Sequence, residues 1–263
     1  MRKFLLFISL ISFVACSKDS SNDQCVDQTL IRQIRLNSYD IQKITYNQNC
    51  QVIESIEPIR YSNYIYNNQN QLVKIEEKMS LSGLSCYMPT GIDGESFTDP
   101  RKAKVTSYVS FEYNTDGFIS KKSRYYSSGD SYKQVSYELY SYLNSKVAKI
   151  ENYDINNKLV DYTIYNYDDK ENVQSSDYYL ITQEGAVLKQ TDSYLYDNQL
   201  NPFRIFSFDG TPGLYTNLNN IVSEKSITYN KENKLEYTTT YKMEYNDRGY
   251  PFKVNDKSYI YGN

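Results

Sequence analysis

The clearest pattern in this chain is a strict alternation of polar and apolar positions between Lys234 and Tyr245. Lys, Glu and Thr occupy one set of positions, and the other set is apolar or aromatic at five of six: Leu235, Tyr237, Thr239, Tyr241, Met243 and Tyr245. A period of two sends successive side chains to opposite faces of a β-strand. The pattern therefore predicts one strand over 234–245, with an aromatic face and a polar face exposed to solvent.

Similar Tyr-rich and β-branched runs, bounded by Asn, Asp, Gly or Ser, predict further strands. They cover 29–36, 40–46, 51–57, 71–79, 103–113, 131–142, 159–167 and 221–229. No segment shows a convincing helical period. We therefore expect an all-β fold, a long antiparallel meander of short hairpin repeats rolled into an open barrel or a curved sheet.

The turns between these strands repeat a motif, aromatic-x-Tyr-(Asn/Asp)-x-x-(Gly/Asn)-x-apolar. The second turn position is the Gly/Asn position, three residues after the Asn/Asp. Clear copies have Asn70, Gly117, Asn233 or Gly249 there, and weaker copies have Cys50, Asn157 or Glu171. The first Asn or Asp can accept hydrogen bonds from the backbone ahead, and Gly or Asn tolerates positive φ. Each copy therefore predicts a hairpin with a type I turn followed by a G1 bulge.

Tyrosine dominates the aromatic content, with 30 Tyr against 10 Phe and no Trp. The two aromatics of each motif are spaced by two, so both rings lie on one face and we expect most of them to pack in the interior. The alternating partners are Lys, Glu, Ser, Thr and Asn, and the mean hydropathy is -0.68. An apolar outer band facing lipid is therefore not predicted.

Composition removes several function classes. The chain has no His, which excludes Ser-His-Asp and Cys-His nucleophilic machinery and imidazole-bound metal sites. The net charge of -3 and the pI of about 5.2 exclude the basic footprint that nucleic acid demands. We expect a protein that is not an enzyme and uses no cofactor.

The first residues predict export. Arg2 and Lys3 precede an apolar stretch over 4–14 that is too short to span a bilayer, which is typical of a signal peptide over residues 1–15. The sequence Phe13-Val14-Ala15-Cys16 resembles the bacterial lipobox, which implies lipidation of Cys16. Residues 16–28 are polar and predict a flexible tether, which leaves residues 29–263 as the β-repeat domain.

Few residues stand out as chemical candidates. Asp93, Glu95 and Asp99 lie in an irregular segment over 80–102, but their spacing does not match a calcium loop, and we predict no metal site. The acidic neighbours Asp168-Asp169 and Glu76-Glu77 would point to opposite faces of a strand, so we predict no catalytic residues. A second irregular segment covers 209–219, and such loops often carry function.

Three cysteines remain once Cys16 is lipidated, in an oxidising compartment. If three short strands follow one another from Thr29, Cys50 lies at the same end of the sheet as Cys25. Cys86 follows a later strand, roughly 23 Å long, at the opposite edge. We therefore predict a disulfide between Cys25 and Cys50.

The turn motif resembles the Tyr-Asp repeats of RHS-type proteins, and with the lipobox it looks more like the Tyr- and Asn-rich lipoproteins of Bacteroidota. One such family is a domain of unknown function with a porin-like β fold. The resemblance implies a rolled meander on a lipid tether, located in the cell envelope as an outer-membrane lipoprotein, surface-exposed or periplasmic.

Three functions are compatible with these features. The first is a non-enzymatic binding or scaffolding module for a glycan or a protein, attached to the membrane only through its lipid anchor. The others are a carboxylate-based glycan hydrolase and a passive structural protein of the envelope.

Overall fold

The computed structural model describes residues 27, 29–79, 104–230 and 233–262, which form one long sheet and one 3-10 helix. The first nine strands are β1 (Ile31–Leu36), β2 (Tyr39–Tyr46), β3 (Val52–Ile56), β4 (Arg60–Tyr66), β5 (Leu72–Met79), β6 (Ser107–Tyr113), β7 (Ile119–Ser128), β8 (Ser131–Leu143) and β9 (Lys146–Asp154). The remainder are β10 (Leu159–Tyr167), β11 (Val173–Thr182), β12 (Gly185–Leu200), β13 (Asn219–Tyr229), β14 (Lys234–Thr240), β15 (Met243–Tyr245), β16 (Pro251–Val254) and β17 (Lys257–Tyr261), with the 3-10 helix η3 (Pro202–Asp209) between β12 and β13.

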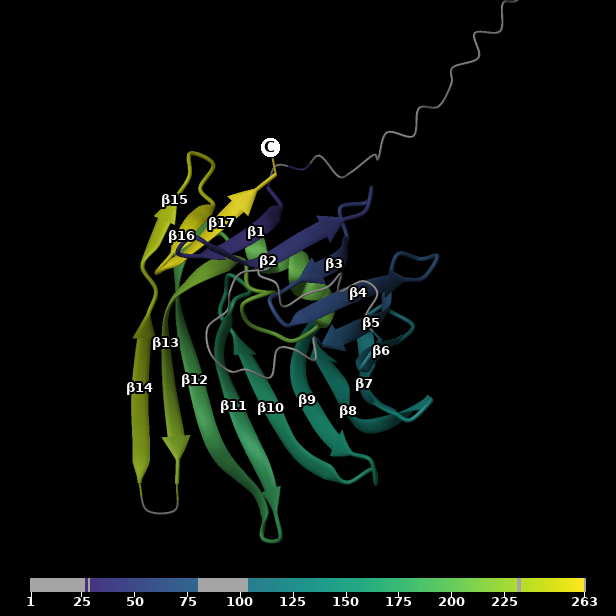
Figure 1. Ribbon diagram of the computed structural model, residues 1–263. Helices are drawn as coiled ribbons and strands as arrows, with labels where there is room; N and C mark the ends of the chain where they lie inside the picture. The colour runs from purple at the N-terminus through teal and green to yellow at the C-terminus, as the bar shows by residue number, and fades with distance from the viewer. Residues whose placement is uncertain (1–26, 28, 80–103, 231–232, 263) are drawn as a thin grey trace, which may run out of the picture.

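The sheet is an antiparallel meander, as predicted. Each strand from β1 to β14 pairs with the next, and β17 returns to pair with β1, followed outward by β16 and β15. The two ends of the sheet are therefore β14 and β15, which are not paired with one another. The sheet curves around an interior without closing into a barrel, and the lower halves of β8 to β14 extend beyond the shorter strands β1 to β5 (Figure 1).

The single strand predicted over 234–245 is wrong, because the chain changes partner at its middle. Tyr241 still donates its N–H to Val222 of β13, but Lys242 exchanges hydrogen bonds with Asn255 in the turn between β16 and β17. The segment therefore divides into β14, paired with β13, and β15, paired with β16. Alternation alone does not record such a change of neighbour.

The repeated turns are confirmed in six hairpins. Asn47, Asn67, Asn114, Asp154, Asp168 and Asn246 each accept, through the side-chain Oδ1, the N–H groups two and four residues ahead. The second turn position has positive φ in each copy, at Cys50 (59°), Asn70 (61°), Gly117 (82°), Asn157 (60°), Glu171 (71°) and Gly249 (78°). The turn at Asn233 adjoins residues 231–232, which lie outside the described residues.

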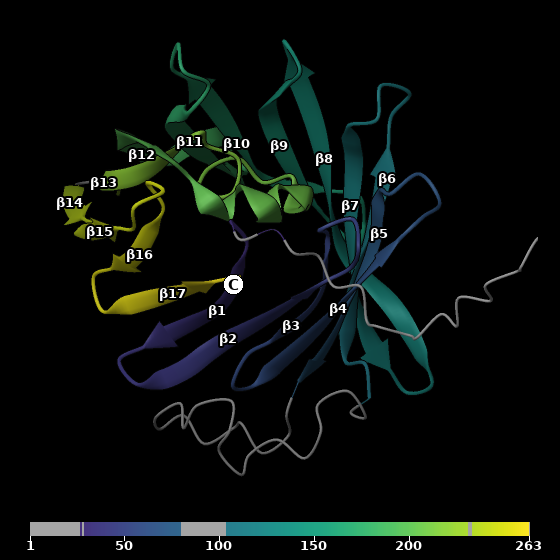
Figure 2. The ribbon, with the colours of Figure 1, turned by 90° about the horizontal axis from the view of Figure 1, so that it is seen from above.

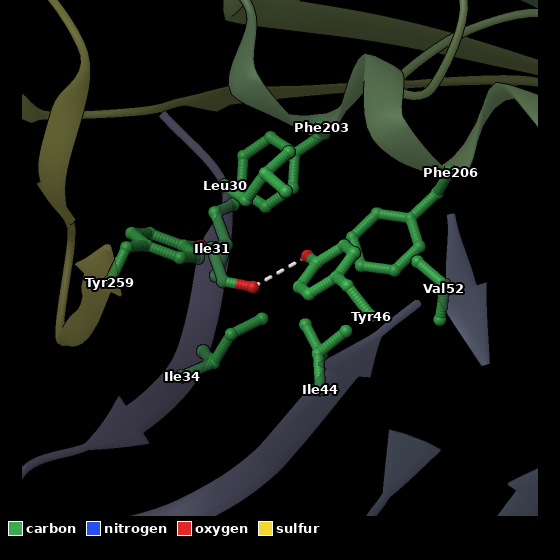
Figure 3. Close-up of a cluster of buried hydrophobic side chains, with 9 residues drawn as sticks. All are labelled: Leu30, Ile31, Ile34, Ile44, Tyr46, Val52, Phe203, Phe206 and Tyr259. Carbon is green, nitrogen blue, oxygen red and sulfur yellow. Dashed lines mark hydrogen bonds between the residues drawn. The ribbon is translucent and has the colours of Figure 1, made fainter. Parts of the chain in front are cut away.

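The tyrosine that precedes most of these turns has a second role that the sequence motif did not reveal. Its hydroxyl donates to the backbone carbonyl of a residue at or near the start of an earlier strand. Figure 3 shows one such bond, from Tyr46 to Ile31 (2.6 Å). The others join Tyr66 to Val52, Tyr113 to Leu72, Tyr142 to Ile119, Tyr167 to Val147, Tyr196 to Val173 and Tyr261 to Pro251. Each of these seven tyrosines thus ties its strand to an earlier one.

A second set of tyrosines, most of them outside the repeated motif, lies on the outer face. Directly opposite residues on neighbouring strands stack in three places: Tyr108 with Tyr125, Tyr137 with Tyr153, and Tyr162 with Tyr179, at centroid distances of 4.4, 4.9 and 4.8 Å. A lysine lies over one ring of each pair, namely Lys74, Lys121 and Lys149. Each stack therefore has one ring covered on both faces, by its partner and by a lysine.

The helix η3 lies inside the curve of the sheet (Figure 2), and no helical period predicted it. Its local signals are those of a capped helix, because the Asn201 side chain accepts from Phe203 N, Pro202 starts the helix, and Gly210 ends it with φ 76°. Phe203 and Phe206 are buried against strands β1 to β3 (Figure 3). The segment over 209–219, expected to be an irregular loop, continues from this helix through the interior.

Cys50 is disulfide-bonded. The other cysteines, including Cys16, Cys25 and Cys86, lie outside the described residues, as do the signal peptide, almost all of the tether and the segment 80–102. The Cys25–Cys50 pairing and the lipidation of Cys16 therefore stay predictions. Within the described ranges, no helix is long and apolar enough to cross a membrane.

Candidate functional site

The candidate site is the interior of the curved sheet, which η3 divides into two spaces. The larger cavity has a volume of about 1010 Å³ and is lined on the helix side by Phe203, Phe206 and Asp209. The smaller one, about 770 Å³, lies against Arg204, Ile205 and the repeated turns. Because opposite faces of the helix line the two spaces, η3 acts as a partition.

One wall of the larger cavity carries acids and arginines in alternation. Arg60 Nη2 of β4 lies 2.7 Å from Glu57 Oε1, and Arg60 Nη1 lies 3.8 Å from Glu77 Oε1 of β5. Arg124 Nη1 of β7 lies 3.8 Å from the other oxygen of Glu77, which also accepts from Ser107 Oγ at 2.8 Å. Two acids and two bases therefore form a row without net charge.

This row has unused hydrogen-bonding capacity. Arg60 Nε is buried and has no partner among the described residues. A guanidinium carries five N–H donors, and among the described residues Arg124 has one ion-pair contact at 3.8 Å, which is longer than a hydrogen bond. A ligand in the cavity would find donors at Arg60 and Arg124 and acceptors at Glu57 and Glu77.

Beside this row, Lys122 of β7 is 8% exposed and lies between two carboxylates. Its Nζ is 2.9 Å from Glu138 Oε2 of β8 and 3.0 Å from Asp209 Oδ1 at the end of η3. Burial alone would lower the pKa of Lys122, but the charges of Asp209 and Glu138 raise it above its ordinary value. This cluster is internally paired and fastens η3 to the wall.

Tyrosines complete the lining. Tyr64, Tyr194, Tyr241 and Tyr259 all face the larger cavity. Tyr241 donates its hydroxyl to Glu224 Oε2 at 3.1 Å, and burial raises the pKa of Tyr194 and Tyr259 to about 12. The cavity thus combines aromatic rings with charged and hydroxyl groups.

The acidic neighbours noted in the sequence do not lie together as pairs in the cavity. Glu77 lines the cavity, whereas Glu76 pairs with Lys74 at 2.7 Å, which confirms that the two point to opposite faces. Asp168 is the first residue of a repeated turn and holds backbone N–H groups. Asp93, Glu95 and Asp99 lie outside the described residues, and no metal-ligand cluster occurs among the residues that are described.

The cavity residues Arg60, Lys122 and Arg124 were not singled out from the sequence. Lys121 and Lys122 are adjacent, and nothing local distinguishes the outward lysine from the inward one. Burial of Lys122 depends on Asp209, which is 87 residues away in the chain. Only the tertiary arrangement brings this site together.

Comparison with known proteins supports the fold. No family model matches this chain, and neither does any curated protein. A porin-like protein from Bacteroides uniformis ATCC 8492 aligns with a TM-score of 0.51 at 13% identity, covering 91% of this chain and 99% of that one. A porin-like protein from Bacteroides vulgatus ATCC 8482 aligns with a TM-score of 0.50 at 10% identity, covering 86% and 91%. The predicted porin-like β fold is therefore confirmed, and at these identities the similarity concerns the fold alone.

Proposed function

We propose that this chain is a non-enzymatic lipoprotein of the cell envelope that binds a neutral oligosaccharide in the larger cavity. The observation that carries the proposal is the cavity of about 1010 Å³. It is lined by tyrosines and by the row of charged residues from Glu57 to Arg124, which has no net charge. Small-molecule sites commonly measure about 300–1,000 Å³, so this space is large enough for a ligand of several rings.

The chemistry of the lining favours sugars over ionic ligands. Sugar hydroxyls donate and accept at the same atom, which matches carboxylate acceptors and guanidinium donors side by side. An anion would meet Glu57 and Glu77, and a cation would meet Arg60 and Arg124. Tyrosine rings offer flat apolar surface for the ring C–H groups.

Glycan-array screening followed by calorimetric titration of the full chain tests this. Arg124→Gln keeps the bulk of the side chain but removes the guanidinium, and we expect it to weaken binding of the array-selected oligosaccharide roughly tenfold. Arg35→Gln is the matched control, because Arg35 pairs with Asp40 elsewhere in the sheet. Selection of charged ligands only, or equal binding by both variants, would contradict the proposal.

The lipoprotein part of the proposal rests on the lipobox at Phe13 to Cys16. Metabolic palmitate labelling should mark the wild-type protein, and Cys16→Ala should remain unlabelled and unprocessed. Two or three acyl chains hold a protein firmly in a membrane, whereas one holds it only marginally. A mature N-terminus at any other residue would overturn the anchor.

The non-enzymatic part rests on the absence of His from the sequence and on the pairing of Glu57, Asp209 and Glu224 with arginine, lysine or hydroxyl donors. We expect no turnover of any oligosaccharide that the chain binds. Hydrolysis that disappears when Glu57, Glu77 or Glu224 is changed to Gln, with the fold intact, would favour the hydrolase instead.

A further inference from the structure

The strand β14 has an open edge. It pairs with β13 through an uninterrupted register from Tyr229–Lys234 to Ser223–Thr240. Within the described part of the chain, no strand pairs with its other side. An unpaired edge presents a row of backbone N–H and C=O groups that can add another strand.

The direction of each backbone group along β14 follows from the bonds at its two ends. Asn233 O accepts from Asn230 N and Tyr241 N donates to Val222 O, so the odd-numbered residues point their backbone groups towards β13. The even-numbered residues Lys234, Glu236, Thr238 and Thr240 therefore present theirs on the open side. Beyond Thr240 the open side is occupied, because Asn255 binds both the backbone N–H and the backbone C=O of Lys242.

The side chains of this edge are unusually exposed. Leu235 is 61% exposed and Tyr237 70%, both on the same side of the sheet as the cavity-facing Tyr241. On the opposite side, Glu236 pairs with Lys234 at 2.7 Å and with Lys225 at 2.9 Å. The edge therefore carries an apolar side and a side on which Glu236 lies between two lysines.

We propose that β14 is the contact through which two copies of this chain associate, antiparallel and with Leu235 on the two-fold axis. In this register Lys234 of each copy lies opposite Glu236 of the other, and Leu235 packs against its own equivalent. A register centred on Glu236 would instead place two carboxylates opposite one another.

Charge reversal in the full-length chain, followed by sedimentation velocity over a concentration series in detergent, tests this pairing. The interface is small, so we expect reversible association that grows with concentration. Lys234→Glu and Glu236→Lys should each weaken dimerisation roughly tenfold, because each places like charges opposite one another twice. The double variant Lys234→Glu/Glu236→Lys restores the complementarity and should return to within about threefold of wild type.

Lys253→Glu is the matched control, since Lys253 forms a comparably exposed pair with Glu244 on paired strands. It should leave dimerisation unchanged. A wild-type chain that stays monomeric up to millimolar concentration overturns the proposal, as does a double variant no better than the single ones. Oligosaccharide binding is not part of this proposal, so either can fail without the other.

Cysteine substitution tests the register. In the proposed pairing, the two Cα atoms at position 235 form a non-hydrogen-bonded pair about 4.5 Å apart, within the range that a disulfide spans. Leu235→Cys should therefore yield a 235–235 cross-link between chains under mild oxidation. The two positions 237 lie about 14 Å apart in this register, so Tyr237→Cys should not couple to itself. The reverse result would show that the register is wrong.

Discussion

The tyrosine hydroxyl that donates to the backbone of an earlier strand gives, at the scale of single residues, a reason for Tyr rather than Phe at these positions. Tyr66, for example, donates to the carbonyl of buried Val52 at 2.8 Å. Phenylalanine would fill the same space but leave that carbonyl without its partner. The same logic applies to seven tyrosines among the described residues.

We therefore expect Tyr66→Phe to lower the free energy of unfolding by about 1 kcal/mol, since it removes one hydrogen bond and no volume. Urea denaturation followed by circular dichroism measures this. Tyr179→Phe is the control, because Tyr179 stacks on Tyr162 on the outer face and should lose close to nothing. Equal losses would mean that the hydroxyl bonds contribute no stability.

Positive φ at the repeated turns leads to a second prediction. A Cβ at Gly117 would meet nothing closer than Gln71 Nε2 at 4.0 Å, so the cost of Gly117→Val comes from the backbone alone, where φ is 82°. We expect a loss of about 1–2 kcal/mol. Lys146→Val, just after a turn whose positive φ values lie at Asn144 and Ser145, should cost less. Equal melting temperatures for the two variants would contradict this.

At the scale of elements, η3 fills the interior of the curved sheet and packs against its inner face. Two hydrophobic clusters lie in the interior, and Phe208 of η3 packs against both. Asn217, fully buried in the segment that follows the helix, accepts from Val173 N and so fixes that segment to β11. The partition between the two cavities is thus part of the core.

Phe206→Ala should consequently destabilise the protein by about 3–5 kcal/mol, the usual cost of removing a buried Phe ring. Thermal unfolding of Phe206→Ala and of Phe252→Ala provides the comparison, because Phe252 is 41% exposed on β16. The second variant should lose about 1 kcal/mol or less. A small loss for Phe206→Ala would show that η3 contributes little to the stability of the core.

The disulfide of Cys50 belongs to the turn between β2 and β3. Non-reducing peptide mapping should recover Cys50 linked to Cys25, and Cys25→Ser should lower stability by about 2–4 kcal/mol, whereas Cys86→Ser should not. Recovery of Cys50 linked to Cys86 would contradict the predicted strand order that places Cys25 and Cys50 at the same end of the sheet.

At the scale of the whole molecule, the buried tyrosines predict how stability depends on pH. Burial raises the pKa of Tyr142, Tyr167, Tyr194 and Tyr259 to about 12, from the value of 10 that is ordinary for an exposed phenol. Their folded-state pKa values are raised, so their contribution is complete below pH 10 and is lost as the pH rises towards 12. The unfolded chain ionises first in this window and is stabilised by it.

Each such tyrosine contributes a slope of at most about 1.4 kcal/mol per pH unit, so several together predict steep alkaline unfolding that begins near pH 10. Absorbance of tyrosinate near 295 nm should rise together with the loss of circular dichroism. Ionisation of nearly all tyrosines near pH 10 while the fold persists would contradict the burial described above.

Local chemistry determined the repeating parts of this protein. The alternation around Tyr64 or Tyr113 and the Asn–Gly turn at Asn114 and Gly117 depend on neighbours within a few residues, so the sequence alone predicted many of the strands, the repeated hairpins and the meander. The placement of the aromatic pairs on one face follows from the same period of two.

Only the tertiary structure decided what fills the interior and where the sheet stops. The burial of Lys122 by Asp209, the row from Glu57 to Arg124 and the change of partner at Tyr241 all join residues that are distant in the chain. A polar residue in a strand has the same local pattern whether it faces a cavity or water. The difference lies in the desolvation and pairing that other strands and η3 impose on it.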